Sequence, residues 1–342
     1  MATHDEMAAF GRESMGLPEG MEIDFSPLGK RGSDRTYFRI RWDGGRSAIL
    51  VAYDPVRVEN QYFADIAAFL SDIDVPVPRV FRHDPAACLM VMEDLGSLDL
   101  ESFKDAAWEE RAPLYRKTLA SVHRLHTVPA DEFPYNRVRL MDPFGPDLYR
   151  WERDYFREHF VEGLCGIAID PSLGEDLEKE LASLAGRIDS SGHCLVHRDL
   201  QSQNVMVRGG EPFLIDFQGM RFGSLFYDLG SLLCDPYVEF PEGAVEELLS
   251  FYYDLSKRQS DWAEFRGRFW EASVQRLMQA LGAYGFLGLK RGLKGYLDHV
   301  PAALRKLRAA AALAGTLPRL SDLVARCEEA SRVVPGRPAG KP

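Results

Sequence analysis

The segment from Leu195 to Gln218 constrains the fold of this chain more than any other part of its sequence. It begins LVHRDLQSQN, continues through VMV and ends FLIDFQ, so that polar clusters alternate with short apolar runs. Runs of this length are typical of short buried strands, which hold the loops that follow them rigidly. The segment therefore predicts a strand–loop–strand unit that presents Asp199, Asn204 and Asp216 from fixed supports.

These three side chains are the groups that phosphoryl transfer needs. Asp199 can accept a proton from a substrate hydroxyl, while Asn204 and Asp216 offer oxygen ligands to a Mg²⁺ ion that bridges nucleotide phosphates. A simpler interpretation is that Asp199 and Asn204 cap a turn and that Asp216 lies in a solvated loop. Turn chemistry alone does not require the three groups in this order, so the pattern predicts a kinase that uses ATP and Mg²⁺. His197 is expected to have a structural role, because its ring can link the two loops by hydrogen bonds.

Composition limits the class of protein further. The 342 residues are enough for two lobes with separate cores, and 46% hydrophobic with 27% charged residues is ordinary for a globular protein. No apolar run reaches the length of a membrane span, and the N-terminus lacks the pattern of a secretory signal. A formal charge of −11 disfavours nucleic acid as a partner.

The cysteines predict a reducing compartment. They are odd in number, scattered and without Cys-x-x-Cys spacing, which argues against both a disulfide framework and a zinc site. We therefore expect free thiols and a cytoplasmic monomer that binds a small molecule and neither membrane nor nucleic acid. The cysteines are Cys88, Cys165, Cys194, Cys234 and Cys327.

The N-terminal part is expected to consist mainly of strands. Residues 35–42 alternate in period two, and Asp43-Gly44-Gly45 is a tight-turn signal that leads into a second strand at 47–53. One helix over 58–71, an extended segment at 75–80, a strand at 88–93 and a hinge at 94–96 follow.

The part after Gly96 is expected to be mostly helical, interrupted by the segment that carries Asp199 and Asp216. Helices are predicted at 114–125, 148–163, 175–188, 227–234, 244–255, 265–289, 300–314 and 320–330. We predict an N-lobe over 1–95, a C-lobe over 96–334 and a disordered tail over 335–342. This is an α+β, two-lobed protein-kinase-like fold, with a small β-rich lobe and a larger helical lobe.

Within that fold the chain resembles aminoglycoside and choline phosphotransferases more than protein kinases. Gln218 stands where protein kinases have Gly after Asp-Phe, and no Ala-Pro-Glu occurs. Tyr227-Asp228-Leu229 follows Asp216 by twelve residues, as in the small-molecule kinases of this superfamily. The resemblance implies that Asp228 braces the catalytic loop.

A narrower resemblance to the bacterial anomeric sugar kinases runs from about residue 28 to 320. Those enzymes phosphorylate N-acetylmuramate and N-acetylglucosamine at C1 in cell-wall recycling, which implies that ATP and an amino sugar give a sugar 1-phosphate and ADP. The matching segments are 32–39 (GSDRTYFR), 93–96 (EDLG), 215–218 (IDFQ), 227–233 (YDLGSLL), 275–276 (QR), 281–284 (LGAY) and 295–301 (GYLDHVP).

The nucleotide site lacks one expected group. The strand at 47–54 carries no lysine for the α- and β-phosphates, a departure that the anomeric sugar kinases share. Arg35 or Arg39 can supply the positive charge instead, or both can pair with surface carboxylates. The residues expected to bind nucleotide are Gly32, Ser33, Asp34 and Arg35 in the first hairpin, with Glu93 and Leu95 in the hinge.

The acceptor residues are harder to identify. Planar polar groups and an aromatic face bind sugars. The candidates on segments expected to flank the cleft are Gln218, Arg221, Tyr149, Trp151, Glu152, Arg153, Gln275 and Arg276. Arg276 can meet a carboxylate such as the lactyl group of N-acetylmuramate, or it can form a salt bridge. Three other functions stay open: an aminoglycoside kinase, a choline-type kinase, and a nucleotide-binding pseudokinase without the lysine.

Overall fold

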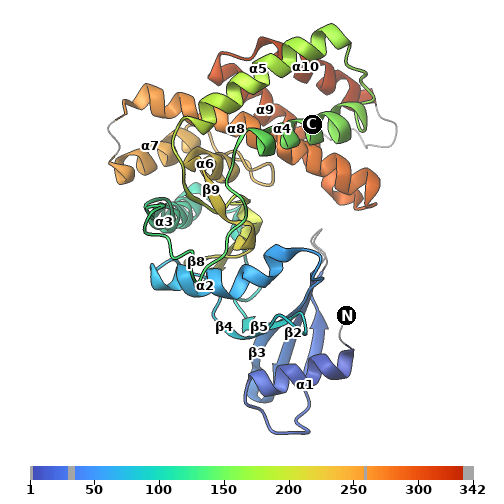
Figure 1. Cartoon of the computed structure of the whole chain (residues 1–342), viewed down its shortest axis with the longest axis vertical. Helices are drawn as coiled ribbons and strands as arrows, with labels where there is room; N and C mark the ends of the chain where they lie inside the picture. Colours follow the sequence, from blue (N-terminus) through green and yellow to red (C-terminus); the bar gives the residue numbers. More distant parts are fainter. Residues whose placement is uncertain (1–2, 30–34, 258–259, 334–342) are drawn as a thin grey trace. The chain divides into compact units, whose positions relative to one another are not determined.

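The computed structural model describes residues 3–29, 35–257 and 260–333. The predicted nucleotide residues Gly32, Ser33 and Asp34 and the predicted tail lie outside these ranges. The chain forms two compact units (Figure 1): unit 1 holds the residues up to Asp142 together with Gln203–Arg221, and unit 2 holds Pro143–Ser202 and the residues from Phe222 onward. The predicted boundary at residues 95 and 96 stays a prediction.

Unit 1 contains a five-stranded antiparallel sheet in the order β1-β2-β3-β5-β4. The predicted first hairpin is present, with Trp42 opposite Arg46 and with Gly44 and Gly45 at positive φ in the turn, where a side chain would be strained. The strands are β1 (Asp24–Pro27), β2 (Thr36–Trp42), β3 (Arg46–Ala52), β4 (Val80–Asp84) and β5 (Leu89–Glu93).

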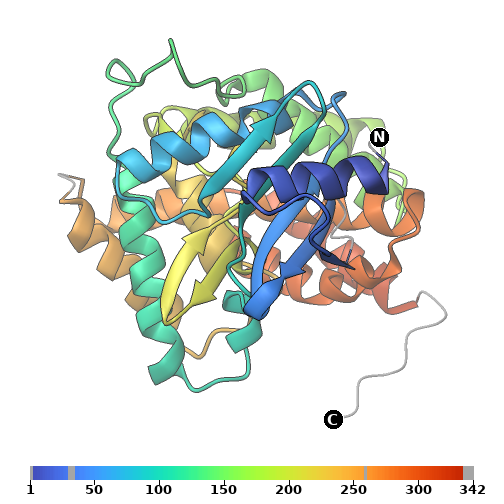
Figure 2. The ribbon, with the colours of Figure 1, turned by 90° about the horizontal axis from the view of Figure 1, so that it is seen from below.

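Helix α1 (His4–Ser14) corrects the expectation that this region is mainly strands with one helix. Met7 and Phe10 of α1 pack on Ile40, Leu50 and other apolar residues of the sheet, and Figure 2 shows α1 lying across the strands. A capping box begins the helix, since Thr3 and Glu6 exchange hydrogen bonds. The Thr-x-x-Glu spacing was therefore the overlooked signal. Strand β4 also extends beyond the extended segment predicted at 75–80.

The rest of unit 1 holds the second half of the catalytic segment. It contains helices α2 (Phe63–Asp72) and α3 (Trp108–His126) and the hairpin of β7 (Val205–Arg208) and β8 (Glu211–Leu214). Helix α3 contacts β8. Phe63 stacks on Phe217 with their ring centroids 4.4 Å apart, and the Leu214 N–H donates to the Pro76 carbonyl at 2.8 Å. These contacts fix the chain on both sides of Asp216.

Unit 2 is mainly helical, as predicted. Its long helix α8 packs against α4, α6 and α9, and β6 pairs with β9 in a short two-stranded sheet. Close helix contacts depend on glycine: a Cβ at Gly230 would lie 2.8 Å from the Ser273 Oγ. The elements are α4 (Pro146–Tyr155), a π-helix (Phe156–Glu162), α5 (Pro171–Asp189), β6 (Cys194–Val196), β9 (Arg221–Gly223), α6 (Leu225–Leu233), α7 (Ala244–Ser256), α8 (Trp262–Gly285), a second π-helix (Phe286–Lys290), α9 (Val300–Ala314) and α10 (Pro318–Val333).

The observed elements agree with the predicted α+β class. The five cysteines are free thiols. Within the described ranges, no helix combines the length and the apolar character that crossing a membrane would need.

Candidate active site

The catalytic loop begins where β6 ends, and a buried carboxylate holds its first residues. The backbone N–H groups of His197 and Arg198 donate to the carboxylate of Asp228 on α6, at 2.7 and 2.8 Å. Arg198 has φ of 76°, a left-handed conformation that costs a side-chain-bearing residue about 1–3 kcal/mol. Asp228, which the resemblance marked as a brace, thus lies against the backbone immediately before Asp199.

A second carboxylate, which the sequence analysis missed, holds the other end of the loop. Asp235 accepts hydrogen bonds from the Ser202 N–H at 2.7 Å and from the Ser202 hydroxyl at 2.5 Å. Burial raises the pKa of Asp235 despite these hydrogen bonds. Asp235 lies two residues beyond the end of α6 at Leu233, so helical periodicity gave no signal for it. Asp199 therefore lies in a loop that is anchored on both sides.

Asp199 is itself held by an arginine from α8. The Arg276 Nη2 donates to Asp199 Oδ1 at 2.7 Å, and the side chains of Arg276 and Asp199 are 5% and 34% exposed. Burial, the largest single effect, opposes the charge of Arg276, but Asp199 together with Tyr227, Tyr284 and Glu152 outweighs it, so that the pKa of the guanidinium is raised. Arg276, for which the sequence left open an acceptor carboxylate or a salt bridge, forms a salt bridge with the predicted base.

Glu152 and Gln275, two further acceptor candidates, lie together in the interior of unit 2. The Gln275 Nε2 donates to one carboxylate oxygen of Glu152 at 3.0 Å, and the Tyr227 hydroxyl donates to the other at 2.7 Å. Glu152 and Gln275 are fully buried. Burial raises the pKa of the Glu152 carboxyl in spite of the charges of Arg198 and Arg276. The two candidates therefore pair with each other in the interior of unit 2.

Asn204 and Asp216 belong to unit 1, because the unit boundary falls between Ser202 and Gln203. They flank the β7–β8 hairpin, and the Ile215 N–H donates to the Asn204 carbonyl at 3.0 Å. The hairpin therefore brings the two predicted metal ligands to neighbouring positions on adjacent backbones. Asp216 has φ of 62°, another strained backbone at a predicted functional residue.

The oxygen atoms at this position suit a magnesium ion. Gln218 donates through Nε2 to Asp216 Oδ1 at 3.0 Å, while its own Oε1 is buried with no hydrogen-bond partner. Carboxylate and carboxamide oxygens are the ligands Mg²⁺ prefers, so Asn204 and Asp216 could hold the ion with Gln218 beside them. In the described part of the chain, no cluster of three or more His, Cys, Asp or Glu residues offers another metal site.

Two arginines of β2 and its approach pair with carboxylates. Arg35 donates to Asp216 Oδ1, and Asp216 raises the pKa of the Arg35 guanidinium against the opposing effect of burial. Arg39 donates to both oxygens of Asp94, at 2.7 and 3.0 Å, and to the Gly96 carbonyl at 2.7 Å. Both arginines thus pair with carboxylates, the second alternative of the sequence analysis. Unlike the surface pairs expected there, Arg35 and Arg39 are largely buried.

The remaining predicted residues, Glu93, Leu95 and Arg221, make contacts within the protein. Glu93 accepts hydrogen bonds from Arg208 at 2.6 Å and from the Arg79 N–H at 3.2 Å, and Leu95 is buried in the hinge. Arg221 donates to the Gly219 carbonyl at 3.2 Å. Contact of Glu93, Leu95 and Arg221 with nucleotide or acceptor stays a prediction.

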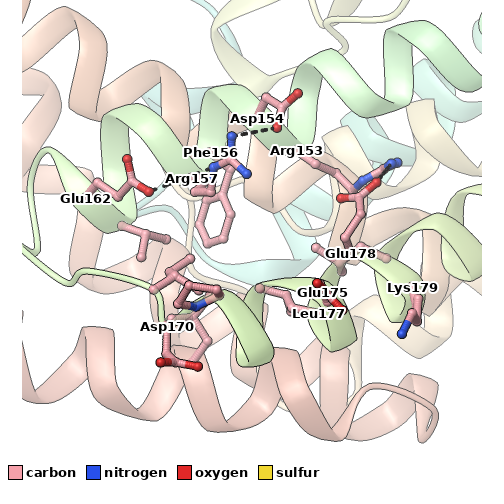
Figure 3. Close-up of a pocket in the computed structure, with 16 residues that line it drawn as sticks. Arg153, Asp154, Phe156, Arg157, Glu162, Asp170, Glu175, Leu177, Glu178 and Lys179 are labelled. Carbon is pink, nitrogen blue, oxygen red and sulfur yellow. Dashed lines mark hydrogen bonds and ion pairs between the residues drawn. The ribbon is translucent and has the colours of Figure 1, made fainter.

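A cavity of about 680 Å³ occupies another part of unit 2 (Figure 3). It is lined by α4, its π-helical extension, α5 and Leu323 of α10, and ion pairs cross its wall, such as Arg153 with Glu178 at 2.7 Å. The described residues that line it include Arg153, one of the acceptor candidates, but not Asp199, Asn204 or Asp216. The cavity is therefore separate from the catalytic loop.

A β-rich unit, a helical unit and a braced loop with a half-buried aspartate define the protein-kinase-like class. Solved structures agree. The chain has a TM-score of 0.60 and 17% identity to a choline/ethanolamine kinase family protein from Mesorhizobium loti, over 94% of this chain and 99% of that one. It has a TM-score of 0.58 and 14% identity to the aminoglycoside phosphotransferase APH(2")-IIa in complex with streptomycin and ATP, over 85% of this chain and 92% of that one.

Sequence comparison gives the family. The model of the phosphotransferase enzyme family matches residues 24–268, more than half of the chain, and the chain belongs to this family. It is 26% identical to the N-acetylmuramate/N-acetylglucosamine kinase of Pseudomonas aeruginosa, over 91% of this chain and 90% of that protein. It is 24% identical to the enzyme of the same name from Neisseria meningitidis serogroup B, over 80% of this chain and 81% of that protein. The protein is thus a phosphotransferase.

Proposed function

We propose that this phosphotransferase uses ATP to phosphorylate the anomeric C1 hydroxyl of an amino sugar such as N-acetylmuramate or N-acetylglucosamine. The observation that carries the choice of acceptor is the similarity to kinases with these two sugars in their names, which extends over 91% of this chain. The products would be a sugar 1-phosphate and ADP. Because ATP is held in the cytoplasm, we place the reaction there, in recycling of cell-wall sugars.

Asp199 is the proposed general base. The anomeric hydroxyl would attack the γ-phosphorus of ATP, its proton would pass to the Asp199 carboxylate, and the bond from the γ-phosphorus to the bridging oxygen of ADP would break. An anomeric hydroxyl is more acidic than an ordinary alcohol, which eases this proton transfer. The hydrogen bonds from the loop to Asp228 and Asp235 support this role, since a base must be held within hydrogen-bond reach of its proton.

Asn204 and Asp216 are the proposed ligands of Mg²⁺, which when bound would neutralise the phosphate charge and orient the γ-phosphate. Arg35, which is bonded to Asp216, is the proposed substitute for the lysine that β3 lacks. A guanidinium is suited to this task because its fork can bind two phosphate oxygens at once.

The experiment is an acceptor panel with ADP formation as the signal. Purified protein is incubated with ATP, Mg²⁺ and, separately, N-acetylmuramate, N-acetylglucosamine, glucose, choline and kanamycin. We expect turnover with the amino sugars and a ³¹P NMR signal coupled to the C1 proton. Turnover only with choline or kanamycin would refute the acceptor, and nucleotide binding without turnover would indicate a pseudokinase.

The base is tested with Asp199→Asn, which keeps the size of the side chain. We expect turnover to fall by at least about a hundredfold, the lower end of what general-base catalysis contributes. Asp261→Asn, in the exposed cap at the start of α8, is the control and should keep wild-type activity. An Asp199→Asn variant with near wild-type turnover would show that Asp199 is not the base.

A further inference from the structure

Arg276 holds Asp199 from a position deep in unit 2. The Arg276 side chain is 5% exposed, and each of its three guanidinium nitrogens donates a hydrogen bond. Nε donates to the Ser231 hydroxyl at 3.0 Å, Nη1 to the Gln279 side-chain oxygen, and Nη2 to Asp199 at 2.7 Å. Ser231 lies on α6 and Gln279 on α8, so two packed helices set the direction of the guanidinium.

The rigidity of this arrangement follows from the geometry of the guanidinium group. Its nitrogens lie in one plane, so fixing two of them on Ser231 and Gln279 also fixes the third, which meets Asp199. A charge-assisted hydrogen bond with a buried donor is also stronger than one in water. The carboxylate of Asp199 is therefore restrained through its side chain as well as through its backbone.

We propose that Arg276 is a positioning residue, which sets the orientation of the Asp199 carboxylate for proton transfer from the acceptor hydroxyl. This inference rests on the proposed function, in which Asp199 is the base. It favours the salt-bridge alternative for Arg276 over binding of an acceptor carboxylate, because Nη2 is bonded to Asp199. In this role Arg276 acts through Asp199 and not directly on ATP or the acceptor.

The test compares Arg276→Gln and Arg276→Lys with a matched control. Arg187 of α5 also pairs with a carboxylate on α8, that of Glu271 at 2.5 Å, and neither residue bonds to Asp199. Arg187→Gln therefore removes a comparable ion pair elsewhere on the same helix. For each variant, kcat and KM are measured with N-acetylmuramate, which carries a carboxylate, and with neutral N-acetylglucosamine.

Arg276→Gln should lower kcat about a hundredfold with both acceptors, the loss expected when a catalytic group is misplaced by about 1 Å. The KM for ATP should stay within about twofold of the wild type. Arg276→Lys should recover part of the loss, because it restores the charge but not the planar fork. In a further pair of variants, added guanidinium ion should raise the turnover of Arg276→Ala and leave that of Arg187→Ala unchanged.

Each other outcome overturns the inference. A kcat of Arg276→Gln equal to that of the wild type would show that Asp199 needs no such restraint, while an inactive Asp199→Asn would still support the proposed function. A higher KM for N-acetylmuramate alone would mean that Arg276 binds the acceptor carboxylate. If Arg276→Gln does not fold, the test uses Arg276→Lys instead. A folded Arg276→Lys with wild-type kcat for both sugars would also refute the inference.

Discussion

Replacing Asp228 by Asn should show how much the catalytic loop depends on one buried carboxylate. In the wild type its two oxygens accept the N–H groups of His197 and Arg198, at 2.7 and 2.8 Å. The amide keeps one acceptor oxygen, so one N–H loses its partner and faces an NH₂ group. Losing a hydrogen bond to an ionised acceptor and leaving a buried donor unsatisfied costs about 3 kcal/mol.

Part of that cost should appear in catalysis. The strained backbone of Arg198 is retained in the wild type because Asp228 binds it, and Asp199 is the next residue. If the whole 3 kcal/mol favours a relaxed loop, the competent conformation is depopulated by about a hundredfold, since 1.4 kcal/mol is a factor of ten. We expect kcat/KM to fall by up to this factor.

Urea unfolding followed by circular dichroism measures the stability of Asp228→Asn, and ADP formation measures its activity. Asp261→Asn is the matched control, because Asp261 accepts the Glu264 N–H at 2.8 Å at the exposed start of α8. Asn and Asp are about equally good at the N-cap of a helix, so the free energy of unfolding of this control should fall by less than about 0.5 kcal/mol. An Asp228→Asn variant with the stability and activity of the control would refute the reasoning.

Two other predictions test the interior of unit 2. Burial raises the pKa of Glu152, so the folded protein binds more protons than the unfolded chain, and its stability falls as the pH rises above the unfolded value of about 4.3. Glu152→Gln removes this pH dependence, and the Gln275 amide can turn so that its unbonded Oε1 accepts a hydrogen bond from the new amide. The free energy of unfolding of the variant, measured in urea, should therefore rise relative to that of the wild type between pH 5 and pH 8. A constant difference across that range would contradict the assignment. Gly230→Ala would place a Cβ 2.8 Å from the Ser273 Oγ and should lower the free energy of unfolding by about 1–3 kcal/mol. Gly267→Ala, on the same helix as Ser273 but with open space around it, should instead raise it by about 0.5–1 kcal/mol, and equal effects would argue against the packing explanation.

Local patterns predicted most of the elements. The period-two residues around Gly44 and Gly45 gave the first hairpin, and apolar residues at helical spacing gave α8 with its π-helical end. The missed α1 was also encoded locally, in the Thr3 and Glu6 capping box, but four residues of cap carry less weight than a long periodic run.

The sequence by itself predicted phosphoryl transfer, the class that the family match shows, because Asp199, Asn204 and Asp216 lie within eighteen residues and their spacing can be read along the chain. Only the tertiary structure decided what surrounds them. Arg276 reaches Asp199 across 77 positions, and Gln275 reaches Glu152 across 123. Such pairs depend on how α4, α6 and α8 pack, and periodicity reports only that each helix has a buried face. The sequence therefore left Arg276 as either an acceptor residue or one half of a salt bridge, and the packed helices pair it with Asp199.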